Sequence, residues 1–263
     1  MSGRERLTEV SRWARGVIRS RRPAQASDVP AFEVAATEEE RAILAACRPY
    51  TLTSPERLLA TMDGVEHAVG ADIGGALVEC GVWLGGNVLA MLLTLQRLGV
   101  DDRDVYLYDT FEGMTEPTDV DKSRFHGSAL DAWRKASEAG ERIWQGWFGT
   151  DVFGLERVSK LLMSTGYPPA RLHFVPGRVE DTIPDQAPGA IAVLRLDTDW
   201  YESTLHELEH LYPRLRAGGV LLIDDYGHWE GARRAVDEYF RDHGKRPLLA
   251  RTDYSGRLAV KPG

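Results

Sequence analysis

The sequence predicts an α/β fold with a mostly parallel seven-stranded sheet, a C-terminal antiparallel hairpin and a helical N-terminal extension. Short apolar runs alternate with longer segments of helical periodicity, which is the pattern of βαβ units. The first of these runs ends in the glycine-rich loop Gly81–Gly86, where a strand would turn directly into a helix. Two apolar segments close the chain on either side of Tyr254–Gly256, as in a hairpin.

The helices ahead of the sheet begin at recognisable caps. Thr37 stands three residues before Glu40, which is the spacing of a capping box, and this predicts a helix start. Ser54 and Pro55 suit the cap and the first helical position of another helix. We expect that helix to run towards Val69.

The N-terminal 22 residues form a separate segment. They carry apolar side chains at helical spacing together with seven arginines, which predicts a basic amphipathic helix. We expect this helix to act as a lid or as a dimer contact. The predicted organisation is therefore a helical extension over residues 1–45 and one α/β domain over residues 46–263.

Seven strands and four intervening helices are expected along that domain. The strands are predicted at 76–80, 105–109, 171–175, 191–196, 219–223, 247–251 and 257–260. The helices are predicted at 87–98, 152–165, 205–215 and 232–240. The polar stretch 115–150 is expected to form a lid, because long loops in compact domains are usually functional or disordered.

Composition and charge narrow the class of protein. Hydrophobic residues make up 43% of the chain, enough for a sizeable core, and no apolar run approaches the roughly 18 residues of a membrane span. The net charge of -8 disfavours nucleic acid and anionic membrane as partners, because clustered Lys and Arg bind both. The two cysteines, Cys47 and Cys80, cannot build a disulfide framework, which favours the cytoplasm.

A nucleoside cofactor is predicted at the ends of the first two strands, because ligands of open α/β sheets bind beyond the carboxyl ends of the strands. The first strand ends at Glu79-Cys-Gly81, and Gly85 and Gly86 follow, whose backbone lets a ligand approach closely. The second strand ends in Asp109, a carboxylate that can accept hydrogen bonds from both ribose hydroxyls.

The kind of nucleoside follows from what this loop lacks. The spaced G-x-G-x-x-G of pyrophosphate binders is missing, and Glu79 would repel phosphate. An acid at this point suits a cationic ligand that carries an amino acid, such as S-adenosylmethionine. The alternative is that these residues are ordinary glycine-rich turns with a capping acid.

Four aspartates stand at the ends of two later strands. The fourth strand ends in Leu196-Asp-Thr-Asp199, and the fifth ends in Ile223-Asp-Asp225. Alternate residues of a strand point the same way, and adjacent strands lie about 4.8 Å apart, so these carboxylates can converge. Crowded carboxylates repel, and a hard cation such as Mg²⁺ is the usual remedy. The alternative is that these acids only cap the helices that follow.

Five segments of the chain carry a combined pattern that is more specific than any one glycine loop. They are Tyr50–Arg57, Val78–Asn87, Tyr106–Met114, Leu196–Thr204 and Ile223–Trp229. In this order they resemble the macrocin O-methyltransferase family of antibiotic biosynthesis, including its noviose-methylating relatives. The resemblance implies a class I methyltransferase-like Rossmann fold and an O-methyltransferase that depends on S-adenosylmethionine and Mg²⁺. The implied acceptor is a deoxysugar hydroxyl of a glycosylated natural product.

The resemblance also implies the residues of the site. The implied cofactor contacts are Thr53, Ser54, Glu79, Gly81, Val82, Trp83, Gly85, Gly86, Asp109, Thr110, Phe111, Arg178 and Val179. Glu79 and the glycine loop would lie along the methionine part, and Asp109 would bind the ribose. The residues beside the adenine would be Thr110, Phe111, Arg178 and Val179. The implied Mg²⁺ ligands are Asp197, Asp224 and Asp225.

Asp197 and Asp199 are the candidate catalytic residues. A bound Mg²⁺ would orient two neighbouring hydroxyls and acidify the one that is methylated. A carboxylate would then accept the proton. Asp199 is close without being needed as a ligand, whereas Asp197 could do both, so both choices stay open. Four tryptophans either line an aromatic entrance for a bulky acceptor or belong to the core: Trp83, Trp147, Trp200 and Trp229. His228 either contacts the substrate or shuttles a proton, or it is structural.

Other functions fit parts of the pattern. A catechol-like phenol is the alternative acceptor, because the metal chemistry would be the same. A nicotinamide oxidoreductase would leave the aspartates unexplained, and a metal-dependent hydrolase would leave Glu79 and Asp109 unexplained. A non-catalytic interaction module on the same fold is the alternative from another class. The expected partners are a small glycoside and a second copy of the chain in a homodimer, with neither nucleic acid nor membrane.

Overall fold

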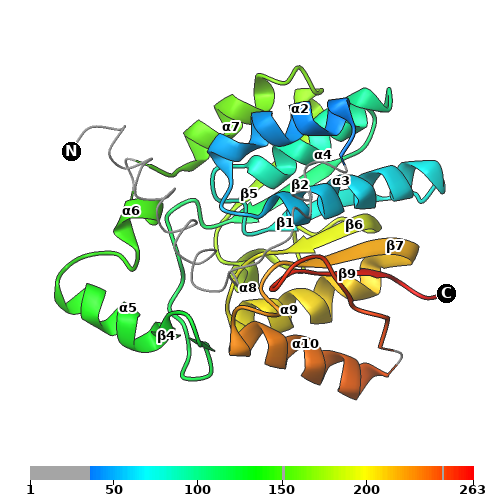
Figure 1. Cartoon of the computed structure of the whole chain (residues 1–263). Helices are drawn as coiled ribbons and strands as arrows, with labels where there is room; N and C mark the ends of the chain where they lie inside the picture. The colour runs from blue at the N-terminus through cyan, green and yellow to red at the C-terminus, as the bar shows by residue number, and fades with distance from the viewer. Residues whose placement is uncertain (1–35, 150–151, 245) are drawn as a thin grey trace, which may run out of the picture. The chain divides into compact units, whose positions relative to one another are not determined.

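Within residues 36–149, 152–244 and 246–263, which the computed structural model describes, seven strands form one sheet in the order β5-β2-β1-β6-β7-β9-β8 (Figure 1). The strands are β1 (Ala76–Cys80), β2 (Val105–Asp109), β5 (Leu172–Pro176), β6 (Ile191–Leu196), β7 (Leu215–Ile223), β8 (Ala250–Arg251) and β9 (Arg257–Val260). Neighbours from β5 to β7 are parallel, and β9 runs antiparallel to both β7 and β8. The predicted sheet and its antiparallel hairpin are confirmed.

The strand order reverses at β1, which places the switch point between β1 and β6. The chain moves outward from β1 to β2 and β5 and then returns to β6 on the other side. Cys80 pairs with Leu196, and Leu196 pairs with Ile223, so the carboxyl ends of β1, β6 and β7 are level. Both β1 and β6 are buried along their whole length, as expected for parallel strands covered on both faces. Ligands of such sheets bind at this edge.

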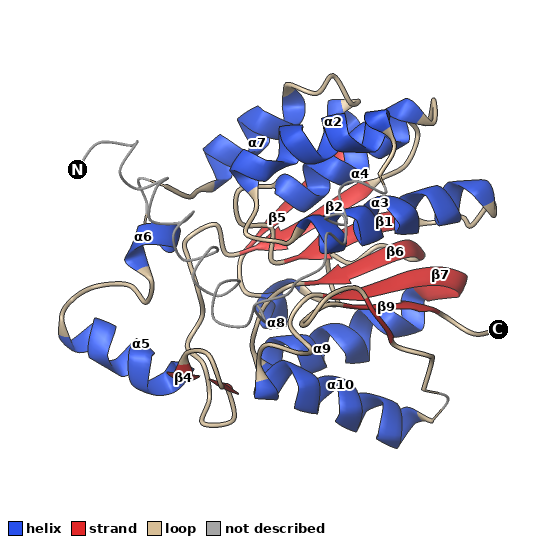
Figure 2. Cartoon of the chain, viewed as in Figure 1, coloured by secondary structure: helices blue, strands red, loops and turns tan. Residues whose placement is uncertain are grey.

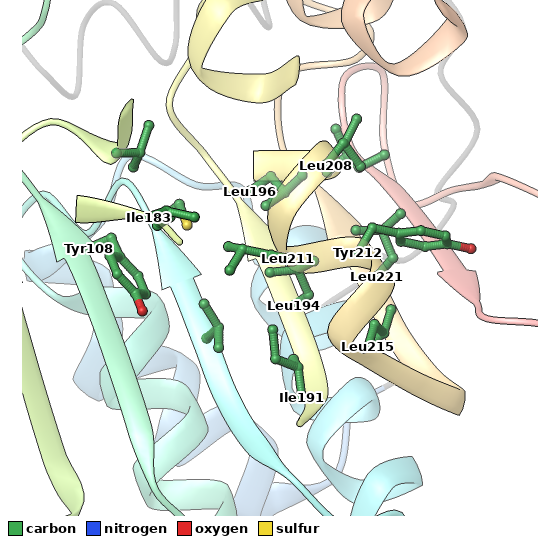
Figure 3. Close-up of a cluster of buried hydrophobic side chains, with 14 of the residues drawn as sticks. Tyr108, Ile183, Ile191, Leu194, Leu196, Leu208, Leu211, Tyr212, Leu215 and Leu221 are labelled. Carbon is green, nitrogen blue, oxygen red and sulfur yellow. The ribbon is translucent and has the colours of Figure 1, made fainter. Parts of the chain in front are cut away.

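Helices cover both faces of the sheet (Figure 2). One layer contains α2 (Glu38–Cys47), α3 (Pro55–Gly70), α4 (Gly86–Arg97) and α7 (Leu155–Met163). The other layer contains α8 (Val179–Thr182), α9 (Tyr201–Leu211) and α10 (Glu230–His243). Short 3₁₀ turns lie at Arg48–Tyr50, Pro169–Arg171 and Tyr212–Arg214. Between the second layer and the sheet lies a buried cluster that includes Leu194, Leu208 and Leu221 (Figure 3).

Ser54 caps α3 as predicted. Its side chain accepts a hydrogen bond from the Arg57 N–H at 3.3 Å, and Pro55 occupies the first helical position. The cap satisfies a backbone donor that the helix leaves unpaired, and it fixes where the helix begins. Arg57 is thereby held in the first turn of α3.

The polar segment after β2 contains elements that the sequence did not predict. It contains the strand pair β3 (Lys122–Ser123) and β4 (Gly127–Ser128) and the helices α5 (Ala129–Glu138) and α6 (Gln145–Phe148). Of the residues of α5, all of which the structure describes, only Ala129 is buried. The role of this segment as a lid stays a prediction.

Helix α9 begins at Tyr201, earlier than the predicted start at 205. The reason is a distant cap, because Asp121 Oδ1 accepts a hydrogen bond from the Tyr201 N–H at 2.8 Å. Asp121 is fully buried and comes 80 residues earlier in the chain. A cap from so far away has no local sequence signal. Strand β7 also begins earlier than predicted, at Leu215 and not at 219.

The predicted N-terminal helix over residues 1–22 lies outside the described residues. The chain divides into the units Met1–Thr37 and Glu38–Gly263. Within the second unit, α2 packs on α3 and α4. The domain boundary after residue 45 and the homodimer stay predictions. None of the described helices is both long enough and apolar enough to cross a bilayer.

Candidate active site

The glycine loop between β1 and α4 approaches neighbouring backbone very closely. Gly81 has φ +82°, and a Cβ there would lie 1.9 Å from the carbonyl oxygen of Asp197. A Cβ at Gly86 would lie 2.6 Å from the carbonyl oxygen of Tyr50. Gly85 has φ +88° and is the N-cap of α4. Only glycine fits at these positions, so the loop is held tightly against the ends of the strands.

We expect Gly81→Ala to destabilise the fold by about 2 kcal/mol or more. The added Cβ would be strained at this positive φ, and it would overlap backbone atoms that cannot move aside. Chemical denaturation measures the loss. Gly70→Ala is the matched control, because nothing lies within 4 Å of a Cβ at the end of α3. Equal stability of both variants would contradict the close approach at Gly81.

Asp109, at the end of β2, holds this loop in place. Its Oδ2 accepts hydrogen bonds from the N–H groups of Val82 at 2.7 Å and Trp83 at 3.0 Å. Its Oδ1 accepts one from the Phe111 N–H at 2.8 Å. Trp83 and Phe111 have left-handed backbone, with φ of +48° and +52°, and these bonds help to offset that strain. Burial raises the pKa of Asp109, although the backbone bonds oppose this. Its contact with a ribose stays a prediction.

The residues predicted beside the adenine lie next to a cavity. Thr110 and Arg178 line a space of about 380 Å³ that also reaches Trp133 of α5. Phe111 and Val179, which follow these two residues in the chain, are buried. These four residues come from the ends of β2 and β5, so the structure brings them to one side of the glycine loop.

A buried arginine, Arg195 of β6, joins the ends of three strands. Its Nη1 donates hydrogen bonds to Glu79 Oε1 and Asp197 Oδ2, both at 2.6 Å. Its Nη2 donates to Asp224 Oδ1 and, at 3.3 Å, to Thr53 Oγ1. The side chains of Arg195 and Glu79 are only 2% and 1% exposed. This arginine connects the predicted cofactor-binding acid of β1 to the acids that follow β6 and β7.

A second arginine, Arg57 of α3, contacts one of these acids, Asp224, and also Asp253. Its Nη1 forms an ion pair with Asp224 Oδ2, and its Nε lies 3.0 Å from Asp253 Oδ2. Ser54 donates from its hydroxyl to Asp253 Oδ2 at 2.8 Å. Thr53 and Ser54, two of the implied cofactor contacts, therefore contact Arg195 and Asp253 respectively.

The structure brings together the acidic cluster, which we define as Asp197, Asp199, Asp224 and Asp225. One oxygen from each of Asp197, Asp224 and Asp225 lies within 4.8 Å of the other two. Two of these carboxylates have compensating charge, because Arg195 pairs with Asp197 and Asp224, and Arg57 pairs with Asp224. Arg195 had a sequence signal, since it stands in β6 two residues before Asp197, which follows the end of that strand.

The acidic cluster keeps an excess of negative charge in spite of both arginines. Asp225 Oδ2 is buried and has no hydrogen-bond partner among the described residues. Burial, followed by repulsion from Asp199 and Asp197, raises the pKa of Asp225 well above its usual value. Burial likewise raises the pKa of Asp197 to about 7 and that of Asp199 to about 8. A further cation would bind the unpaired oxygen and reduce the repulsion between the carboxylates.

Asp199 is held by a tryptophan. It has left-handed backbone, with φ +68°, and its Oδ1 accepts a hydrogen bond from Trp229 Nε1 at 2.8 Å. Trp229 packs edge-on against Trp200 at 5.0 Å between ring centroids, and both are buried. Trp200 and Trp229 therefore belong to the core and support the Asp199 loop. Trp83 is half-buried and donates from Nε1 to the Trp147 carbonyl oxygen at 3.0 Å.

His228 is part of an aromatic surface beside the acidic cluster. Its ring stacks on Phe125 at 5.2 Å between centroids, and its Nδ1 lies 2.9 Å from the Tyr254 hydroxyl. Burial, followed by the charge of neighbouring His126, lowers the pKa of His228 to about 4, so the ring is neutral near pH 7. Phe125 comes from the β3–β4 turn and Tyr254 from the β8–β9 loop. Three segments far apart in the sequence thus meet here.

Comparison with known proteins agrees with the fold and with the family that the motifs resemble. The family described as Macrocin-O-methyltransferase (TylF) matches residues 2–258. The chain is 34% identical over 207 residues to the 8-demethyl-8-(2,3-dimethoxy-alpha-L-rhamnosyl)-tetracenomycin-C 4'-O-methyltransferase of Streptomyces olivaceus, which covers 79% of this chain and 74% of that protein. It is 32% identical over 190 residues to the demethyldecarbamoylnovobiocin O-methyltransferase of Streptomyces niveus, which covers 72% of this chain and 67% of that protein.

Solved structures agree as well. The structure of the O-methyltransferase NovP matches with a TM-score of 0.68 and 30% identity, over 81% of this chain and 83% of that chain. The calicheamicin methyltransferase CalS11 matches with a TM-score of 0.56 and 20% identity, over 90% of this chain and 99% of that chain, and it shows the fold alone. Since the family match spans nearly the whole chain, this protein belongs to the macrocin O-methyltransferase family and is an S-adenosylmethionine-dependent O-methyltransferase.

Proposed function

We propose that this enzyme methylates a hydroxyl of a deoxysugar in a glycosylated natural product, as a step of antibiotic biosynthesis, with Mg²⁺ held by Asp197, Asp224 and Asp225. The observation that carries the proposal is the convergence of these three carboxylates beside the glycine loop. The names of the relatives support the acceptor, because one acts on a rhamnosyl tetracenomycin and another on demethyldecarbamoylnovobiocin.

The residues present fit a divalent cation. Three carboxylate oxygens lie within 4.8 Å of one another, and the buried Asp225 Oδ2 has no hydrogen-bond partner among the described residues. Hard oxygen ligands of this kind suit Mg²⁺, which keeps further positions for water and substrate oxygens. When bound, Mg²⁺ would polarise a coordinated hydroxyl and lower its pKa.

The residues also fit S-adenosylmethionine, which supplies an electrophilic methyl group on a positively charged sulfur. Gly81 and Gly86 hold the loop where a Cβ would clash, so the bare backbone faces the edge at which ligands bind. Glu79 Oε2 is buried and has no hydrogen-bond partner among the described residues, so the ligand's ammonium group could pair with it. Two acids, Glu79 and Asp109, favour a cationic ligand over a phosphate.

Asp199 is the residue that we propose as the base. Asp197 belongs to the proposed ligand set, and its Oδ2 accepts a hydrogen bond from Arg195. Asp199 instead has a neutral donor, Trp229, on one oxygen, which leaves the other oxygen to accept a proton from the acceptor hydroxyl. Methyl transfer requires the hydroxyl to lie in line, at about 3 Å from the methyl carbon, so a rigidly held base is an advantage.

Two measurements test this function. Calorimetric titration should show that S-adenosylmethionine binds with or without Mg²⁺. Methyl transfer to 6-deoxyhexosides of aromatic aglycones should require the metal, with a loss of at least about 100-fold in EDTA. If S-adenosylmethionine binds neither with Mg²⁺ nor without it, the proposal is contradicted. Full activity in EDTA would reject the metal, and transfer to catechol but to no glycoside would reject the sugar acceptor.

A further inference from the structure

Asp224 differs from the other two proposed metal ligands in its partners. Both of its oxygens contact an arginine, Oδ1 through Arg195 Nη2 and Oδ2 through Arg57 Nη1. Asp225, by contrast, has an oxygen without a hydrogen-bond partner among the described residues. A divalent cation that approaches the ligand set therefore meets a guanidinium group already bonded to Asp224. Two cations on one carboxylate oxygen repel each other, so one arginine has to withdraw.

The two arginines are not equally free to withdraw. Arg195 is 2% exposed and donates hydrogen bonds to Glu79, Asp197 and Thr53 as well. Moving it would leave Asp197 and the buried Glu79 without this cation, which is costly. Arg57 is 13% exposed, and it is already close to a second acid. Arg57 is thus the arginine that can leave Asp224.

Asp253 is placed to receive Arg57. Its Oδ2 lies 3.0 Å from Arg57 Nε, within ion-pair distance. The Nε–H is nevertheless not aligned for a hydrogen bond, and it is buried without a hydrogen-bond partner among the described residues. A shift of the guanidinium towards Asp253 would supply that partner and retain a charge pair.

The surroundings confine the movement to the head of the arginine. A Cβ at Gly256 would lie 2.8 Å from Arg57 Cγ and Cδ, so the stem of Arg57 lies against this loop. The loop is itself anchored, because the N–H groups of Ser255 and Gly256 donate to Asp253 Oδ1 at 2.8 Å and 2.6 Å. Ser255 also donates from its hydroxyl to the Asp224 carbonyl oxygen at 2.6 Å. The two alternative acids are therefore held in fixed positions on either side of the guanidinium.

We infer that Arg57 is a positioning residue that competes with the divalent cation for Asp224, and that Asp253 takes over the Arg57 guanidinium when the cation binds. The inference rests on the proposed metal site. It assigns Arg57 and Asp253 a joint role in setting metal affinity. Because Ser54 also bonds to Asp253, metal occupancy is linked to the start of α3 beside the cofactor pocket.

A double-mutant cycle tests this inference, with Mg²⁺ alone titrated calorimetrically into each purified full-length protein. Arg57→Gln should tighten Mg²⁺ binding by about tenfold, because nothing then competes for Asp224 Oδ2. Asp253→Asn should weaken binding by a similar factor, because Arg57 loses its alternative acid. In the Arg57→Gln background, Asp253→Asn should change the affinity by less than about twofold. Thermal unfolding of each variant checks that the fold is intact.

The coupling between Arg57→Gln and Asp253→Asn distinguishes competition between Arg57 and Mg²⁺ from a general effect of charge. A purely electrostatic effect would make Asp253→Asn equally harmful with and without Arg57, and that result would overturn the inference. Arg124→Gln is the matched control, because Arg124 lies over the ring of Phe125 beside the acidic cluster and should change the affinity by less than about twofold. Arg57→Lys keeps the charge but cannot bond to both acids at once. The Mg²⁺ affinity of this variant should lie between those of the wild type and Arg57→Gln. An affinity at or below the wild-type value would contradict competition.

Asp225→Asn distinguishes failure of the inference from failure of the proposed metal site. If Mg²⁺ binds the wild type, and Asp225→Asn abolishes binding while Arg57→Gln leaves it unchanged, the metal site stands and the role of Arg57 is rejected. If Mg²⁺ binds none of these proteins, both the metal site and the inference are overturned.

Discussion

Arg195→Met is expected to destabilise the fold by about 3–5 kcal/mol, because removal of one partner from a buried ion pair leaves uncompensated charge behind. Arg195 donates hydrogen bonds to Glu79, Asp197 and Asp224, and its side chain is 2% exposed. Methionine fills a similar volume without the charge. The decrease in the free energy of unfolding therefore reflects the uncompensated charge of the acids and not a cavity. Denaturation in urea, followed by circular dichroism, gives the free energy of unfolding.

The loss of unfolding free energy in Arg195→Met should increase with pH. Burial raises the pKa of Glu79 to about 8 even with Arg195 in place. A carboxyl whose pKa is higher in the folded state destabilises the fold as the pH rises from its unfolded value towards its folded value. Arg195→Met should therefore cost less at pH 5 than at pH 8. Arg234→Met, which removes an exposed pair with Glu238, should keep the wild-type denaturation midpoint. A loss at Arg195 no larger than at Arg234 would refute the buried network.

Asp199→Asn should lower kcat by about 10²–10⁴-fold while leaving the affinities for S-adenosylmethionine and Mg²⁺ near the wild-type values. Asparagine can still accept the hydrogen bond from Trp229 Nε1, so the loop should keep its geometry. The variant then loses only the proton acceptor. Single-turnover rates and calorimetric titration of both ligands provide the comparison.

Two further variants separate the roles of the aspartates. Asp197→Asn should abolish turnover with cofactor affinity nearly intact, and it should also weaken Mg²⁺ binding, since Asp197 belongs to the proposed ligand set. Trp229→Phe removes the hydrogen bond to Asp199 together with part of the packing against Trp200, and it should lower kcat by roughly tenfold. If Asp199→Asn kept more than a tenth of the wild-type kcat, Asp199 would not be the base, and Asp197 would become the candidate.

The convergence of Asp197, Asp224 and Asp225 could be predicted because it depends on local rules. Short apolar runs alternate with segments of helical periodicity, and this pattern places each aspartate at the end of a strand. Parallel strands end at the same edge of a sheet. The same reasoning places Gly81, Gly85 and Gly86 after β1 and Asp109 at the end of β2. Such positions follow from the order of residues along the chain, and the structure brings them to one edge.

The charge balance of the site could not be predicted in the same way. Arg57 and Asp253 are separated by most of the sequence, and they meet only because α3 and the β8–β9 loop pack beside β7. The Asp121 cap on α9 likewise joins residues 80 positions apart. Pairing over such distances depends on how packed elements are placed, and no periodicity or spacing in the sequence records it.

The sequence by itself therefore determined the sheet, the glycine loop, the strand-end aspartates and the family that these motifs resemble. Each of these follows from local periodicity, caps and residue types at strand ends. Only the tertiary structure decided which charges are buried together. It pairs Arg195 with three acids, places Arg57 between Asp224 and Asp253, and leaves one oxygen of Asp225 without a partner among the described residues. The physical reason is that the energy of a charge depends on its burial and on neighbours from distant parts of the chain.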